Sequence, residues 1–168
     1  MRRLFSMLAL LAAVGLAASA SSAEGTGNWT VDVKKSALDG SETVSFATIA
    51  DKGCALFILC DGKDTDVAFV MLRHFFTRGE QTMPYSVDGG PVQNIKVTTA
   101  NGGAFITPRT NANRAQFING ALIDRDKLVV QLTPRQGKQE LIFEVGGLRE
   151  IITPHLHLCS GLTILDKP

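Results

Sequence analysis

Residues 55–60 read Ala-Leu-Phe-Ile-Leu-Cys, and the polar turn Asp61-Gly62-Lys63 follows them directly. Successive side chains of an extended strand point to opposite faces, so an unbroken apolar run places apolar groups on both faces. Such a run is typical of a strand with other elements packed on each side. We therefore expect residues 55–60 to form a central strand that is covered on both faces.

On either side of this run, apolar and polar residues alternate with the period of two that indicates a half-buried strand. Before it, the alternation occurs at residues 29–34 and 44–48. After it comes a long β-prone run at residues 67–76, which Arg73-His74 is expected to break or bend. Further strands are predicted at residues 104–107, 128–133 and 141–145.

One hairpin is indicated by its turn. The sequence Asp88-Gly89-Gly90-Pro91 separates two β-prone segments, residues 85–87 and 92–97. Asp-Gly between such segments is a strong short-range signal, so a hairpin is predicted over residues 85–97.

Two segments have helical rather than strand spacing. Residues 111–122 place apolar side chains at intervals that suit a short helix. Residues 148–159 carry a helical apolar stripe, but Pro154 lies inside it. Because proline lacks the amide hydrogen that a helix interior needs, we expect this second helix to be bent or interrupted.

These elements amount to about eight short strands and two short helices, with turn signals roughly every 8–12 residues. We predict a mainly β fold, either an antiparallel β-sandwich or a partly open barrel, with one or two short helices. No repeat, linker or low-complexity segment divides residues 24–168, which we interpret as a single β-rich domain.

The N-terminus has the pattern of a secretory signal peptide. Arg2 and Arg3 precede an almost continuous apolar run at residues 4–18, and small residues follow at 19–23. Cleavage after Ala20 or after Ala23 fits the pattern. We favour Ala23, which makes Glu24 the first residue of a polar mature start. Residues 1–23 are thus predicted to be a signal peptide, and the domain is predicted to be periplasmic or secreted.

Charge argues against two classes of partner. The chain has 17 basic and 16 acidic side chains, for a net charge of +1. The basic residues form no stripe, which argues against nucleic-acid binding and against polybasic attachment to a membrane. After the signal peptide, no apolar run approaches the roughly 20 residues of a membrane span.

Three cysteines follow the signal peptide, namely Cys54, Cys60 and Cys159. On one extended strand, Cys54 and Cys60 would lie roughly 20 Å apart, which is beyond disulfide reach. Export makes a disulfide plausible, and Cys60–Cys159 is the better pair, with Cys54 left free. The alternative is three buried free thiols.

The one metal-like cluster is His155, His157 and Cys159, three residue types that can bind zinc. On a helix the two histidines would point to opposite sides, and Cys159 is better used in a disulfide. Asp61, Asp64 and Asp66 lack the glycine and terminal glutamate of a calcium loop, so a solvated turn is expected. No metal or cofactor is therefore predicted.

Other candidate residues have ordinary structural explanations. Trp29 is expected to anchor the core, and His74 to serve structure or a strand edge. Arg109, Arg114 and Arg125 surround the middle helix, where they form either a basic face for an acidic partner or scattered surface charge. Because no hydrolase or nucleotide-binding motif occurs either, we do not expect an enzyme.

Several blocks of the sequence, in this order, match a known family. They are Trp29-Thr30-Val31, residues 36–46, residues 55–65, the hairpin at 83–91, residues 128–134, residues 143–148, and finally Pro154 and Cys159. The chain resembles the VasI-like or TagO-like periplasmic proteins associated with type VI secretion. Gly40 replaces an aspartate of the family's turn, and Ser86 stands where arginine is common.

The resemblance implies an exported, β-rich accessory domain with one disulfide and no known catalytic residue. We therefore expect a non-enzymatic accessory or protein-binding module of the cell envelope. It would present a sheet face or the hairpin at 85–97 to an envelope or secretion-apparatus protein. The alternative hypothesis is a secreted inhibitor of a hydrolase, because small disulfide-tied β domains often insert a loop into a target.

Overall fold

The computed structural model describes residues 28–50, 52–71, 78–100, 105–108, 110–135 and 137–164. The predicted signal peptide, its cleavage site at Ala23 and Glu24, His74 and Arg109 lie outside these residues. The strands are β1 Thr30–Lys35, β2 Glu42–Ile49, β3 Cys54–Cys60, β4 Thr65–Met71, β5 Gly79–Val87, β6 Gln93–Ala100, β7 Phe105–Pro108, β8 Lys127–Leu132 and β9 Gln139–Glu144. The helices are α1 Asn111–Ala121, α2 Leu148–Ile152 and the 3-10 helix η2 Thr153–Leu158.

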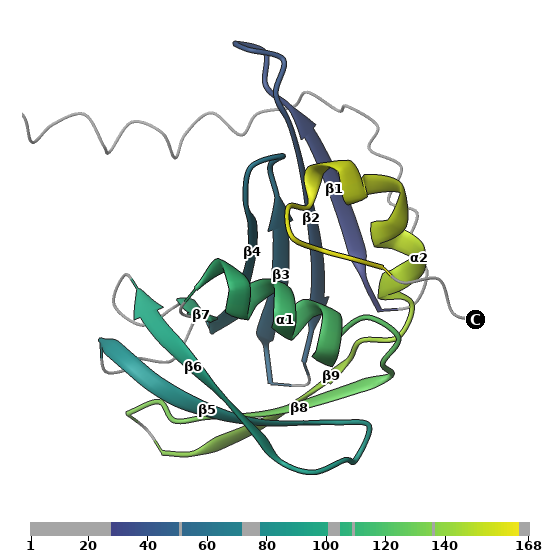
Figure 1. Ribbon diagram of the computed structural model, residues 1–168. Coiled ribbons are helices and arrows are strands. Elements are labelled where there is room, and N and C mark those ends of the chain that lie inside the picture. The colour runs from purple at the N-terminus through teal and green to yellow at the C-terminus, as the bar shows by residue number, and fades with distance from the viewer. Residues whose placement is uncertain are drawn as a thin grey trace, which may run out of the picture.

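All the strands of the described residues belong to one antiparallel sheet, in the order β1-β2-β3-β4-β7-β6-β5-β8-β9. Figure 1 shows that β1–β4 run crosswise to β5, β6, β8 and β9, so the sheet curls around α1. The predicted mainly β fold is confirmed. Of the two architectures that the sequence allowed, the partly open barrel describes this single unclosed sheet better than a two-sheet sandwich.

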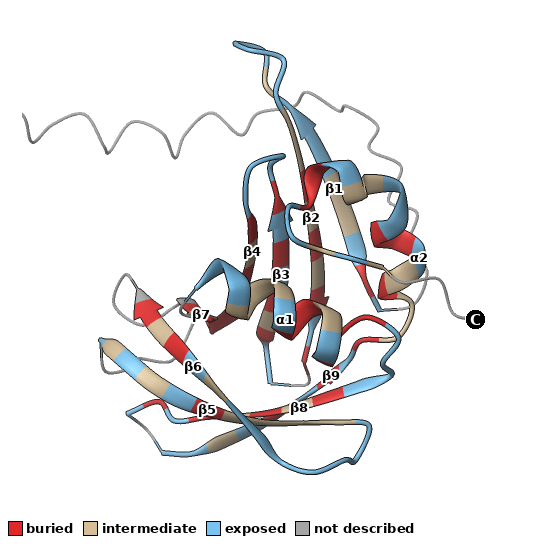
Figure 2. Ribbon diagram, in the orientation of Figure 1, coloured by how far each residue is buried: buried red, intermediate tan, exposed pale blue. Residues whose placement is uncertain are grey.

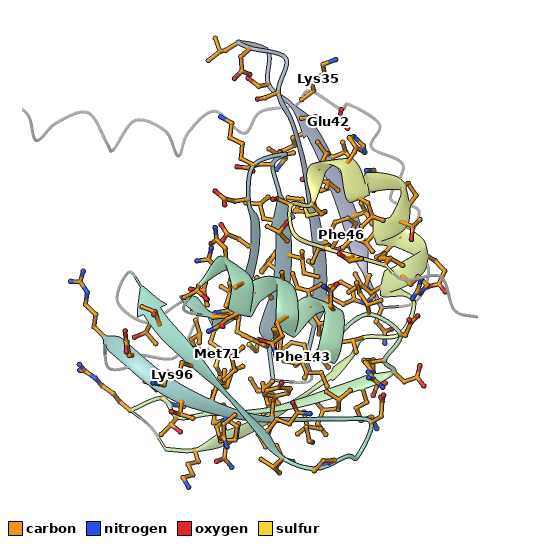
Figure 3. All side chains as sticks on the ribbon, in the orientation of Figure 1. Lys35, Glu42, Phe46, Met71, Lys96 and Phe143 are labelled. Carbon is orange, nitrogen blue, oxygen red and sulfur yellow. A yellow bond between two sulfur atoms is a disulfide. The ribbon has the colours of Figure 1, made fainter. Side chains whose placement is uncertain are left out.

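The core fills the concave side of the curled sheet. Alternate residues of the strands point inward and are fully buried, among them Phe46, Leu56, Ile58, Phe69, Val130 and Phe143. Helix α1 lies over them and buries Phe117, Ile118 and Ala121. The Phe117 ring meets the rings of Phe69 and Tyr85, with centroid distances of 6.0 and 5.2 Å. Figure 3 shows Phe46, Met71 and Phe143 within the sheet and helix assembly, and Lys35 projecting outside it.

The hairpin between β5 and β6 has the turn that the sequence predicts. Asp88 and Gly89 adopt positive φ angles of 50° and 72°. The Asp88 carboxylate also accepts hydrogen bonds from the backbone amides of Asp126 and Lys127, at 3.0 and 2.9 Å. The amide of Lys127, followed by that of Asp126, lowers the pKa of Asp88. The turn is therefore tied to the start of β8.

The C-terminal helix is interrupted at its proline, as predicted. Residues 148–152 are α-helical, and the chain continues as a 3-10 helix with Pro154 in its first turn. Proline is tolerated there because the first amides of a helix have no internal partner. The 3-10 segment covers the inner side of β2, where the rings of Phe46 and His155 lie 5.9 Å apart.

The barrel-like curl brings β9 next to β2 and the residues that flank the first two strands, without joining them in a ladder. Trp29 donates its indole N–H to the carbonyl of Val145 at 3.0 Å. The Thr48 hydroxyl donates to the carbonyl of Glu144 at 3.4 Å, and the Lys52 ammonium to that of Glu140 at 2.8 Å. We call this boundary the seam. Trp29 is thus a core anchor, as predicted, and it also closes the seam with its polar end.

Candidate functional site

The outer face of β3 is the main departure from expectation. Cys54, Leu56, Ile58 and Cys60 point inward and are fully buried. Phe57 and Leu59 point to the other side, where 38% and 44% of their surface is exposed. The prediction that this strand is covered on both faces is therefore wrong for the outer face. The described residues supply a cover only on the inside.

The strand register places small residues beside these two large ones. Phe57 lies between Ala47 and Ala68, and Leu59 lies between Ser45 and Asp66. Small neighbours leave space beside a large side chain, which creates a groove of about 540 Å³ on the sheet. Its lining is mostly apolar. We call this the β3 groove, and it is lined by Ser45, Phe57, Ile58, Leu59, Asp66, Ala68, Val70, Thr107 and Arg114.

One ion pair forms the polar rim of the β3 groove. Arg114, in the first turns of α1, contacts the Asp66 carboxylate at 2.5 Å. The guanidinium also donates to the carbonyl of Pro108 at 3.3 Å and to the side chain of Asn111 at 2.7 Å. These contacts hold the arginine in one orientation. Asp66 keeps about half of its side-chain surface open to solvent, so it can still accept a hydrogen bond from a bound molecule.

The groove has the general character of a binding site. Ligand and hot-spot pockets are usually apolar, with a few fixed polar groups that set orientation. The backbone beneath these side chains is already ordered in the sheet, so its ordering adds no entropic cost to association. The arrangement suits the reception of an apolar side chain or chain segment with a polar group at one end.

The predicted disulfide is present. Cys60 at the end of β3 is bonded to Cys159, with Cα atoms 4.7 Å apart, and Cys54 is free and buried. Burial raises the pKa of the Cys54 thiol to about 12. The backbone amide of Gly62 donates to the carbonyl of Leu158 at 2.8 Å, next to the disulfide. The β3–β4 turn and η2 are therefore joined by both a covalent and a hydrogen bond.

The metal-like cluster is not assembled. Cys159 is in the disulfide, His155 packs against Phe46, and His157 is exposed. Within the described ranges, no three His, Cys, Asp or Glu side chains are grouped so that they could hold a metal ion.

The three acids of the β3–β4 turn serve local structure. Asp61 accepts hydrogen bonds from the amides of Asp64 and Lys63 at 2.8 and 2.9 Å, and these bonds, the first more than the second, lower its pKa. Asp64 accepts from the side chain of Asn111 at 2.9 Å, while Asp66 forms the rim ion pair. A solvated turn was the expectation, and two of these acids in fact anchor the start of α1.

The arginines around α1 do not make a common basic face where they are described. Arg114 is paired with Asp66, on the β3 groove. Arg125 donates to the carbonyl of Gly120 and lies 3.9 Å from Asp88. Of the groove residues, the sequence singles out Arg114, Asp66 and those of the apolar run at 55–60. It does not single out Ser45, Ala68 and Thr107, because only the strand register brings them to this face.

A second exposed feature is the tip of the β1–β2 hairpin, which protrudes from the molecule in Figure 1. Leu38 is 99% exposed there. The turn is held by Ser41, whose amide and hydroxyl donate to Asp39 at 3.0 and 2.7 Å, and by the amide of Leu38, which donates to the Ser36 hydroxyl. Hydrogen bonding from Ser36 and then Ser41 lowers the pKa of Asp39 to about 2.

Among the helices that the structure describes, none has the length and apolar character needed to span a membrane. Comparisons with protein-family models, with curated proteins and with solved structures give no match to this chain.

Proposed function

We propose that this protein is an exported, non-enzymatic accessory or protein-binding module of the bacterial cell envelope, and that it docks its partner in the β3 groove. One observation carries the proposal. The sequence of β3 is apolar on both faces, but the chain's described residues cover only the inner one. A partner protein supplies the second cover.

The energetics favour a small apolar contact at the centre of a larger interface. Covering the exposed parts of Phe57 and Leu59 contributes about 1 kcal/mol each. An inserted side chain from the partner would gain a similar amount in the space beside Ala68. The rim ion pair of Asp66 and Arg114 then selects a partner that brings a hydrogen-bond donor to the open side of the carboxylate.

Three observations support the proposed location in the cell envelope. The N-terminus has the pattern of a signal peptide, and the Cys60–Cys159 disulfide suits an oxidising compartment. The resemblance to periplasmic proteins associated with type VI secretion points to an envelope or secretion-apparatus protein as the partner.

The non-enzymatic assignment is supported by the groove lining, which includes Ser45 and Asp66 but no histidine or cysteine.

The test is capture of periplasmic proteins with the purified domain and with two variants. Leu59→Ser removes the apolar side chain from the groove, and Ile142→Ser removes a similarly exposed one from β9 as a matched control. A partner that binds the wild type and the control but is lost with Leu59→Ser supports the groove. A photo-crosslinking residue in place of Thr107 should then attach to that same partner. Equal capture by all three proteins would place the contact elsewhere.

The alternative function, a secreted inhibitor of a hydrolase, is favoured by one specific feature. Leu38 stands fully exposed on a turn that its own hydrogen bonds keep rigid, which suits insertion into a target's pocket. Leu38→Asp would abolish inhibition of such a target while leaving capture through the β3 groove unchanged. The two functions are therefore separated by two single variants.

A further inference from the structure

The free edge of β1 has a defined pattern of backbone groups. The amide of Ser36 donates to the carbonyl of Ser41 at 2.7 Å, which closes the β1–β2 hairpin with a hydrogen-bonded pair. Such pairs alternate along an antiparallel ladder, so Thr30, Asp32 and Lys34 bond to β2. The N–H and C=O groups of Val31, Val33 and Lys35 therefore point away from the sheet.

These outward groups have no ladder partner among the described residues, because β1 ends the strand order and pairs with β2 alone. Figure 2 shows β1 as exposed or intermediate along its whole length, and Val33 is 43% exposed. An open edge of this kind is a template for another strand, which completes the hydrogen bonds that water otherwise satisfies.

The side chains of β1 are complementary to a second copy of themselves. When two β1 strands pair antiparallel with Val33 opposite Val33, Asp32 lies opposite Lys34 of the second copy, and Lys34 lies opposite its Asp32. All four charges are on the outer face of the joined sheet. In one copy the Lys34 ammonium already lies 2.9 Å from the Asp32 carboxylate. The two-fold pairing therefore joins two ion pairs into a cluster of four charges of alternating sign. Opposite charges directly across a ladder stabilise it, and like charges destabilise it.

The same sequence argues against the neighbouring registers. The outward groups of Val31, Val33 and Lys35 meet each other only when odd-numbered residues of one copy pair with odd-numbered residues of the other. Each allowed shift of the register therefore changes the sum of two paired residue numbers by two. One such step places Asp32 opposite Asp32, and the step in the other direction places Lys34 opposite Lys34. Of these three registers, only the one centred on Val33 satisfies both the backbone and the charges.

We propose that the protein forms a two-fold homodimer by antiparallel pairing of β1 with β1 of a second copy, centred on Val33. The sheet then continues from one copy into the other. Because the two-fold axis is perpendicular to the joined sheet, both β3 grooves face the same side. The dimer does not depend on the proposed partner. A pair of six-residue strands buries less than the roughly 1,200 Å² of a stable standard interface, so the dimer forms reversibly with rising concentration.

Charge reversal tests the register by sedimentation equilibrium of the purified protein up to about 1 mM, the weak end of measurable association. Lys34→Asp places Asp opposite Asp, and Asp32→Lys places Lys opposite Lys, so each variant alone should be monomeric. An equimolar mixture restores both opposite-charge pairs and should dimerise like the wild type. Lys138→Asp, with the same charge change on an exposed loop, should dimerise normally.

Two substitutions at the centre test the backbone pairing. Val33→Pro removes an outward N–H without touching a bond to β2, so it should abolish the dimer and keep the melting temperature of the monomer close to wild type. Val33→Cys should form an intermolecular disulfide, because paired Cα atoms lie about 5.5 Å apart. Lys35→Cys, opposite Val31 of the second copy, should not.

Three results would each overturn the proposal. The first is a wild-type protein that stays monomeric up to about 1 mM. The second is a charge-reversed mixture that dimerises no better than its components. The third is a dimer that persists in a folded Val33→Pro variant, which would show that the contact lies elsewhere.

Discussion

The strands β9 and β1 both end the same sheet, but their outward backbone groups meet different surroundings. On β9 the outward positions include Glu140 and Glu144, whose carbonyls accept hydrogen bonds from Lys52 and Thr48. The curl of the sheet brings these donors within reach. Along the seam, side chains thus supply the hydrogen bonds that a neighbouring strand supplies inside a sheet.

No such donors cap β1 in the described part of the chain. The residues of β1 whose backbone groups point away from the sheet are Val31, Val33 and Lys35. Lysine on an edge strand usually discourages unwanted pairing, but Lys34 lies 2.9 Å from Asp32, which can pair with the Lys34 of a second copy across a two-fold axis. The contrast teaches that one edge is closed within the molecule, whereas the other is selective for a partner strand with the matching charge order.

The largest effect is expected from loss of the disulfide. Replacing Cys60 and Cys159 by alanine should lower the free energy of unfolding by up to about 4–5 kcal/mol, because a loop of 99 residues is no longer closed. The change frees η2, which covers the inner side of β2. Amide exchange should therefore increase more in β1 and β2 than in β8 and β9. Equal increases in all four strands would contradict a separate role for the β1 side.

Two substitutions of Trp29 test the seam. Trp29→Ala should cost about 3–5 kcal/mol, because it empties a fully buried site. Trp29→Phe keeps most of the apolar packing but leaves the carbonyl of Val145 without its donor, for a smaller loss of about 1–3 kcal/mol. Urea denaturation of both variants separates packing from hydrogen bonding. Equal stability of the phenylalanine variant and the wild type would show that the indole bond contributes nothing to the seam.

A smaller effect is expected from the hydroxyl of Thr48, a buried group. Thr48→Val keeps the shape of the side chain but removes the donor to Glu144, which should cost about 1 kcal/mol. The matched control is Thr43→Val on the outer face of β2, where little change is expected. If the two variants lose the same stability, the loss does not come from the seam.

The smallest effect concerns the hairpin tip next to the open edge. The pKa of Asp39 is lowered from 3.8 to about 2 by its hydrogen bonds to Ser36 and Ser41. A lowered folded pKa means that the carboxylate stabilises the turn above about pH 4, and that this contribution is lost as the pH falls toward 2. NMR titration should show the Leu38 amide shifting with Asp39 in that window. In Asp39→Asn the shift should disappear, and a midpoint near 4 in the wild type would contradict the bonds.

Elements with local signals were predicted well from the sequence. The Asp88-Gly89 turn, the helix at residues 111–122 and the break at Pro154 each follow from the backbone preferences of a few neighbouring residues. The extended β3 also excludes a bond between Cys54 and Cys60, and the structure has the predicted Cys60–Cys159 bond instead. In these cases the physical cause lies within one segment.

The β3 groove was not predictable in the same way. An apolar run shows that a strand prefers cover on both faces, but it does not show whether its own chain provides that cover. The space beside Phe57 and Leu59 depends on Ala68 and Ser45, which only the pairing of three strands brings there. A shift of one residue would place other side chains in the groove. The contact of Arg114 with Asp66 likewise depends on where α1 lies over the sheet.

The position of Cys54 also bears on how the chain oxidises. Once β3 is extended, its two thiols sit at opposite ends of a rigid spacer, and the sulfur of Cys60 can meet only the C-terminal one. Cys54 is buried at the far end of β3, and its raised pKa disfavours the thiolate, so it is poorly placed to attack the finished bond. A chain that cross-links wrongly before β3 forms still exposes a nucleophile that can undo the error. Thiol exchange is therefore open to misfolded molecules and closed to correctly folded ones.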